Sequence, residues 1–159
     1  MNWKQHIIDC LNSTQFMSLA THGKDGVWAN PVYFNFDDRF NFYFISMPGS
    51  LHMKNIEEDD QVALAIYSTE QEPNGDVWGI QIKGRAVFVK ESETDLAHKT
   101  YFEETPYRRP VPPAHEPKAY VKSDAEWRMM KVVPEEIYCF DTRHFGENRV
   151  TVPMNELLN

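Results

Sequence analysis

The stretch that joins the end of a predicted strand to the start of a predicted helix is Ile45-Ser46-Met47-Pro48-Gly49-Ser50-Leu51-His52-Met53-Lys54-Asn55. The strand ends at Ser46, Pro-Gly makes the turn, and Ser50 is a suitable N-cap residue. The first amide groups of a helix have no partners inside it, and with the helix dipole they attract an anion. Ser46, Ser50, His52 and Lys54 lie within one turn of this point. The stretch predicts a phosphate site, and the alternative is an ordinary capped surface helix.

A second stretch, Trp28-Ala29-Asn30-Pro31-Val32-Tyr33-Phe34, lies inside a predicted strand over residues 27–36. A proline within a strand gives up one ladder hydrogen bond. The backbone groups left unpaired there can meet the edge of a flat heterocycle. The alternative interpretation is a plain edge strand or a bulge.

Short apolar runs separated by turn residues continue through most of the chain. Gly79 and Gly84 are expected bends or bulges in a long strand, and Pro134 divides the last two strands. Residues 62–67 are apolar enough to be buried on both faces of a sheet. We expect a mainly β (α+β) fold, a closed or partly closed barrel of about six or seven antiparallel strands with flanking short helices. The predicted strands are 16–21, 27–36, 40–46, 62–67, 77–90, 127–133 and 136–141, and the predicted helices are 3–12, 50–58 and 92–104.

Composition narrows the class of protein. The 159 residues fit one domain, 1–159, and a net charge of −8 argues against a nucleic-acid partner. Cys10 and Cys139 form no C-x-x-C motif and are expected to be free core thiols in a reducing compartment. The polar N-terminus and the short apolar runs predict a cytoplasmic protein without a membrane span. Nucleotide-loop, hydrolase and metal motifs are missing, and the acidic run 57–60 is expected to be a solvated helix end.

Taken in order, several short stretches resemble the pyridoxamine 5'-phosphate oxidase-like family. The similarity covers residues 14–90 with order and spacing intact. The first set is Leu19-Ala20-Thr21, Asp25-Gly26 and Asn30 to Phe34, the second is Phe42 to Ser46, Gly49 to His52 and Asn55-Ile56, and the third is Val62 to Tyr67 and Ile82 to Ala86.

The resemblance implies an FMN-binding split β-barrel, mainly β with flanking short helices, that works as a homodimer with the flavin at the subunit interface. It places Asn30, Pro31, Val32 and Tyr33 along the isoalloxazine ring and ribityl chain. It places Ile45, Ser46, Ser50, Leu51 and His52 at the phosphate. The family's oxidase carries an Arg-Lys pair where this chain has Leu51-His52, so FMN is expected to bind more weakly unless Lys54 or the partner subunit compensates. The segment 140–149 does not match the Arg- and Trp-rich ending of that oxidase, so oxidation of pyridoxamine phosphate is not implied.

The expected function is that of an FMN-dependent oxidoreductase acting on a small-molecule substrate, with the chemistry supplied by the flavin. No catalytic residue can be named; His22, His144 and Arg149 are candidates only by type. Five prolines in segment 105–118 predict an extended excursion in which Tyr107, Arg108, Arg109 and His115 reach toward a ligand. The alternatives are a plain surface loop for that segment and, for the whole chain, a flavin-binding sensor or storage module, a barrel using deazaflavin or haem, or a barrel without a cofactor.

Overall fold

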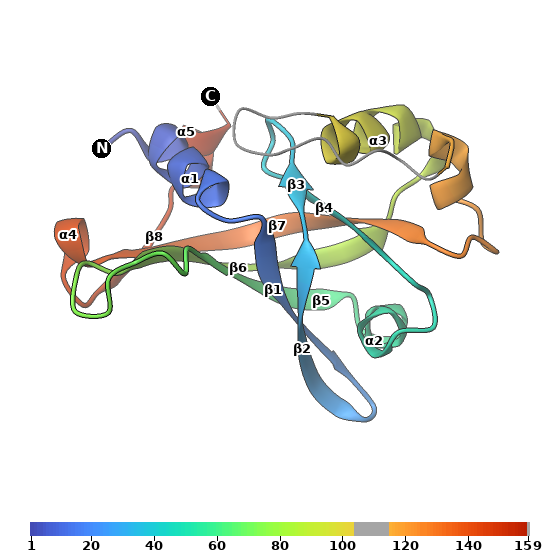
Figure 1. Ribbon diagram of the computed structural model, residues 1–159, viewed down its shortest axis with the longest axis horizontal. Coiled ribbons are helices and arrows are strands. Elements are labelled where there is room, and N and C mark those ends of the chain that lie inside the picture. The colour runs from blue at the N-terminus through green and yellow to red at the C-terminus, as the bar shows by residue number, and fades with distance from the viewer. Residues whose placement is uncertain (104–114, 159) are drawn as a thin grey trace.

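One antiparallel sheet organises the computed structural model, which describes residues 1–103 and 115–158 (Figure 1). Its strands are β1 (Phe16–Gly23), β2 (Gly26–Tyr33), β3 (Asn35–Phe36), β4 (Phe42–Ser46), β5 (Gln61–Tyr67), β6 (Trp78–Phe88), β7 (Arg128–Asp141) and β8 (Arg149–Thr151). Its helices are α1 (Trp3–Asn12), α2 (Leu51–Glu58), α3 (Thr94–Phe102), α4 (Thr142–Phe145) and α5 (Met154–Leu157), with 3₁₀ turns η1 (Glu91–Glu93) and η2 (Pro117–Tyr120).

The sheet curls because one extended segment supplies strands to both ends of it. The strand order is β2-β1-β5-β6-β7-β4-β3, and β8 pairs with β7. β2 and β3 are separated by Phe34 alone, yet they lie at opposite ends of this order. This arrangement confirms the predicted split barrel. The prediction of one strand over 27–36 was wrong, because the segment leaves β1 at Phe34 and joins β4.

Alternating side chains fill the inside of the curl. In β1, every second residue from Met17 to Gly23 is buried, as expected of a strand with one covered face. Four phenylalanines, Phe34, Phe40, Phe42 and Phe44, are among the fully buried side chains of this core. A smaller cluster lies on the other side of β4 and β7 and includes Tyr43, Tyr101, Phe102, Tyr120 and Met129.

The last long strand is continuous, contrary to the expected division at Pro134. β7 runs through Pro134 because a bulge removes Glu135 from the pairing: Gly84 lies opposite Pro134, and Lys83 lies opposite Glu136. A bulge is one of the few places where a sheet accepts proline. The expected irregularity at Gly84 is confirmed; a Cβ there would lie 2.5 Å from the Val133 carbonyl oxygen.

Burial of β5 on both faces was also a wrong prediction for the single chain. Only Val62, Leu64 and Ile66 are buried, whereas Ala63 and Tyr67 are exposed on the outer face. The outer face of the central strands thus carries apolar residues with no cover from the described part of the chain.

The segment after β6 begins with a 3₁₀ turn rather than with the predicted helix. α3 starts at Thr94, and its buried residues include Thr94, Ala97 and Tyr101 at helical spacing. Leu96 of the same helix is 58% exposed. Most of the proline-rich segment, with Tyr107, Arg108 and Arg109, lies outside the described residues. Pro117 opens η2, where a first helical position tolerates proline.

Candidate functional site

The predicted phosphate stretch forms a small hydroxyl and imidazole cluster where β4 meets α2. Ser46 ends β4, and its Oγ lies 2.6 Å from Nε2 of His52 in the first turn of α2. Both side chains are buried, at 8% exposure each. Ser50 Oγ lies 3.4 Å from Ser46 Oγ and 3.3 Å from His52 Nε2. Ser46, Ser50 and His52 therefore form one hydrogen-bonding group.

Ser50 occupies the predicted N-cap position, but its hydroxyl makes no capping hydrogen bond to the helix. Its Oγ donates to the Met47 carbonyl oxygen at 2.7 Å, and no side chain caps the amide groups of α2. The first amide groups of the helix consequently keep the capacity to bind an anion.

Burial lowers the pKa of His52 below its ordinary value of 6.5. A neighbouring phosphate would raise this pKa, which is the opposite influence. In the chain alone, His52 therefore favours the neutral imidazole at pH 7. A phosphate dianion beside it would favour uptake of a proton.

The remaining residues of this stretch differ in accessibility. Leu51 and Lys54 are exposed on α2. Ile45 alternates with Ser46 along β4 and packs against the smaller core cluster beside α3, on the face opposite Ser46. The structure therefore brings Ser46, Ser50 and His52 together, but it does not bring the Ile45 side chain to them.

The second stretch lies next to the first, because β2 contacts both α2 and β4. β2 is an edge strand that pairs only with β1, so its other side offers unpaired backbone groups within the described structure. Pro31 lies opposite Ser18 and is exposed, whereas Val32 is buried in the core. Asn30 has a buried Oδ1 with no hydrogen-bond partner among the described residues. Tyr33 packs edge-on against Tyr101 of α3, with ring centroids 5.6 Å apart.

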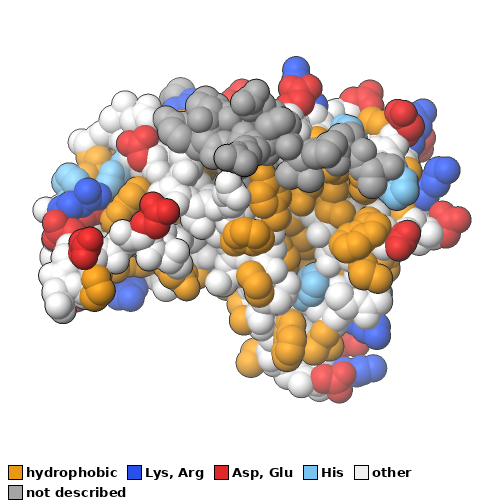
Figure 2. Space-filling model, in the orientation of Figure 1, with side chains coloured by type: hydrophobic (Ala, Val, Ile, Leu, Met, Phe, Trp, Pro, Cys, Tyr) orange, Lys and Arg blue, Asp and Glu red, His pale blue; other side chains and the backbone are white. Residues whose placement is uncertain are grey.

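Apolar side chains are exposed beside these two stretches. Val27 and Trp28 of β2 are 82% and 47% exposed, and Leu51 of α2 is 36% exposed. Figure 2 shows hydrophobic side chains gathered in this region of the surface. The surface around the candidate site is therefore suited to contact with a flat ligand or with another protein surface.

Sequence reasoning missed Arg128, the first residue of β7. The β4–β7 register places it directly opposite Ser46. Its guanidinium carbon lies 4.2 Å from the centre of the Phe88 ring, at the end of β6. Arg128 is 82 residues from Ser46 in the sequence, and only the pairing of β4 with β7 makes them neighbours. No local motif indicated this contact.

The side chains named as candidates by type lie elsewhere. His22 is exposed in β1, 3.9 Å from Asp59. His144 belongs to α4, and Arg149 begins β8; Figure 1 shows both elements at the end of the molecule opposite α2. His115 donates its backbone amide to the Tyr120 hydroxyl at 3.2 Å. The structure does not gather these residues around the Ser46–His52 cluster.

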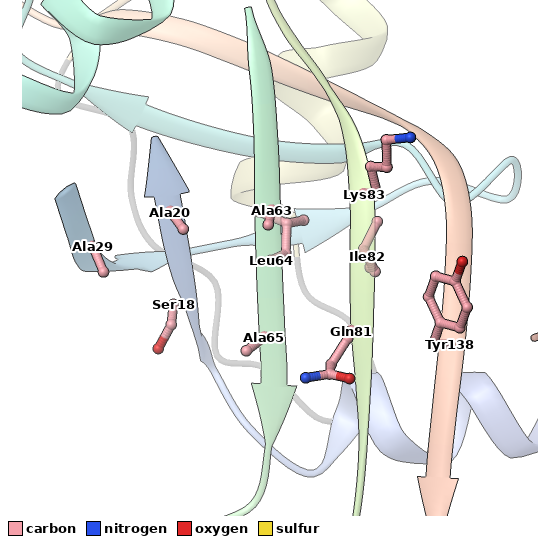
Figure 3. A pocket seen from close by; sticks show the side chains of 10 residues that line it. All are labelled: Ser18, Ala20, Ala29, Ala63, Leu64, Ala65, Gln81, Ile82, Lys83 and Tyr138. Atoms are coloured by element: carbon pink, nitrogen blue, oxygen red, sulfur yellow. The ribbon is translucent and has the colours of Figure 1, made fainter. Parts of the chain in front are cut away.

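A shallow groove of about 430 Å³ crosses the outer face of the sheet (Figure 3). Figure 3 shows small side chains at positions where an exposed sheet usually carries longer polar ones. None of the predicted cofactor residues lines the groove, although Ala29 is the neighbour of Asn30 in β2. The lining residues are Ser18, Ala20, Ala29, Ala63, Leu64, Ala65, Gln81, Ile82, Lys83 and Tyr138.

Within residues 1–103 and 115–158, no helix is long and apolar enough to cross a membrane. Over the same residues, no group of three or more His, Cys, Asp or Glu side chains is arranged to hold a metal ion.

Comparison with known structures identifies the same fold. A haem-binding protein from Mycobacterium smegmatis matches 99% of this chain at 15% identity and a TM-score of 0.74, and the chain spans 60% of that protein. General Stress Protein 26 from Bacillus anthracis matches 96% of the chain over its whole length, at 18% identity and a TM-score of 0.64. An FAD-binding protein from M. smegmatis matches 86% of this chain and 93% of its own, at 15% identity and a TM-score of 0.59.

Sequence comparison supplies the family. No curated protein sequence matches the chain significantly. The family model described as pyridoxamine 5'-phosphate oxidase matches residues 4–137, which include every predicted cofactor residue. The chain therefore belongs to the pyridoxamine 5'-phosphate oxidase family.

Proposed function

We propose that this protein binds FMN and acts as an FMN-dependent oxidoreductase on a small-molecule substrate. The observation that carries the proposal is the buried Ser46–His52 contact at the uncapped start of α2, directly beside the edge strand β2. The Ser46–His52 contact at the helix start is suited to a phosphate group, and the edge strand β2 is suited to the edge of a flat ring.

The residues present fit the chemistry of FMN. Ser46, His52 and the first amide groups of α2 supply hydrogen-bond donors for a phosphate. The buried, unpartnered Oδ1 of Asn30 supplies an acceptor for a ring N–H. When bound, the flavin supplies hydride or electron transfer, and the protein supplies position and electrostatics. Ser46 and His52 would hold the phosphate, and residues 30–33 would orient the ring system.

We further propose that the protein is a homodimer with the flavin at the subunit interface. Support comes from the outer face of the sheet, where Ala20, Ala29 and Ala63 form a cross-strand row of small side chains. β5 has the apolar sequence of a strand covered on both sides, yet the single chain covers only one. A second copy across a two-fold axis would cover the other.

A second candidate cofactor is haem, favoured by the likeness to the haem-binding protein over 99% of this chain. For location we propose the cytoplasm, because Cys10 and Cys139 are both buried and unpaired, as is usual in a reducing compartment.

The test is the visible spectrum of the purified protein, followed by mass spectrometry of any small molecule released on denaturation. FMN gives two absorption bands and the mass of the phosphate ester. A Soret band would support haem instead. A protein that arrives without cofactor and binds neither FMN nor haem in titration would overturn the proposal.

A further inference from the structure

We propose that Arg128 completes the anion site formed by Ser46 and His52 and supplies the full positive charge that holds the phosphate of the cofactor. The inference rests on the proposed FMN function and adds the residue that reads its phosphate. Leu51-His52 offers one titratable imidazole and no permanent cation. The permanent cation comes from a distant strand instead.

The position of Arg128 is fixed by strand pairing. Directly opposed residues of antiparallel strands have Cβ atoms about 5 Å apart and project from the same face. Ser46 and Arg128 are such a pair, and Ser46 in turn contacts His52. The side chains of Arg128 and Ser46 therefore project from the same face at this end of the sheet, where Ser46 contacts His52 of α2.

Arg128 has no anionic partner of its own within the described structure. Its Nε is buried without a hydrogen bond, and no carboxylate among the described residues lies within ion-pair distance. Arg85 and Arg143, by contrast, are each held by carboxylates at 2.5–2.9 Å. A partly buried charge without a counter-ion is costly, so proteins usually pair such groups. A phosphate at the Ser46–His52 cluster would provide the missing partner.

The surroundings of Arg128 hold it ready for such a partner. Its guanidinium carbon lies over the Phe88 ring, 4.2 Å from the ring centre, and an arginine held on an aromatic ring can still donate through its N–H groups. Burial lowers the pKa of Arg128, while the nearby Glu57 carboxylate opposes that effect without forming an ion pair. An arginine retains its charge under these conditions. A planar guanidinium can bind two oxygens of one phosphate at once.

Titration with FMN and with riboflavin, which lacks the phosphate, tests the proposal through flavin fluorescence. The variants are R128Q and R128K, and R85Q is the matched control because Arg85 is paired on the outer face. We expect R128Q to weaken FMN binding by about 10- to 100-fold, the usual effect of losing a charge-assisted hydrogen bond. Riboflavin binding should change by less than about twofold. R128K should lie between, and R85Q should match the parent.

The outcomes separate this inference from the proposed function. A parent protein that prefers FMN to riboflavin, together with an R128Q variant that keeps the same preference, overturns the role of Arg128 alone. Equal weakening of both flavins shows a structural role and also overturns it. A parent protein that binds neither flavin overturns both the function and the inference. If thermal unfolding shows that R128Q is unfolded, the preference measured with R128K decides.

Discussion

Substitution of Asp141 tests how α1 and α4 are held to the end of the sheet. Its side chain is fully buried at the end of β7. It accepts hydrogen bonds from the backbone amide of Arg143 at 3.0 Å, from Arg143 Nε at 3.0 Å and Nη2 at 2.9 Å. It also contacts His144 Nδ1 at 3.0 Å, and His6 Nε2 of α1 lies 3.4 Å away. One carboxylate thus links α1, β7 and α4.

The perturbation is Asp141→Asn, which removes the charge and keeps the shape. Burial by itself raises the pKa of Asp141, but the hydrogen bonds from Arg143 and His144 outweigh it and bring the pKa from 3.8 to about 2. At about 1.4 kcal/mol per pKa unit, this corresponds to roughly 2.5 kcal/mol of stability at neutral pH. Arg143 and His144 are 44% and 48% exposed, so water retains part of their solvation. We therefore expect a loss of about 2 kcal/mol, or about 4–8 °C in Tm.

The lowered pKa of Asp141 determines how its contribution to stability changes with pH. Because the pKa of Asp141 is lower in the folded chain than in the unfolded chain, the carboxylate stabilises the fold above about pH 4. This contribution is lost as the pH falls toward 2. The difference in stability between the parent and Asp141→Asn should therefore be full at pH 7 and much smaller at pH 2.5.

Urea unfolding followed by tryptophan fluorescence measures this difference at both pH values. Two reporters are close: Trp78 lies 5.4 Å from the Arg143 guanidinium, and Trp3 stacks on Phe145 at 5.7 Å. Asp76→Asn is the control, since Asp76 is exposed and contacts only Thr142 among the described hydrogen bonds. A loss of stability of equal size at pH 7 and pH 2.5 would refute the electrostatic reasoning, as would no loss at pH 7.

Three further predictions follow from the site and the sheet. His52→Ala should weaken FMN about 10- to 100-fold at pH 6 and less at pH 8, because the imidazole loses its proton as the pH rises, while riboflavin binding stays constant; equal weakening of both flavins would contradict this. Gly84→Ala should lower the free energy of unfolding in urea by about 1–3 kcal/mol, because its Cβ would lie 2.5 Å from the Val133 carbonyl oxygen. Gly49→Ala, with open space around its Cβ, should leave that free energy unchanged, and equal effects of the two substitutions would contradict the packing argument. Ala63→Arg should convert the proposed dimer into a monomer in light scattering, and a monomeric parent with cofactor bound at micromolar concentration would contradict the dimer.

Local sequence patterns predicted several of the longer elements and the mainly β fold class. The alternation in 16–23, the helical spacing of Ile7 and Leu11 and the Pro48-Gly49 break each report a preference within a few residues, and the structure places strands and helices there. The same locality explains why the Ser46–His52 contact could be anticipated: six residues and one turn separate the two side chains.

Tertiary structure decided everything that depends on which strands pair. No local pattern indicates that residues 26–36 run from one end of the sheet to the other. No local pattern indicates that one strand continues through Pro134. Arg128 lies opposite Ser46 only because β4 pairs with β7, and His6 reaches Asp141 only because α1 lies beside the end of β7. The physical reason is that hydrophobic periodicity fixes which face of a strand is buried, whereas its neighbours are fixed by the packing of the whole core.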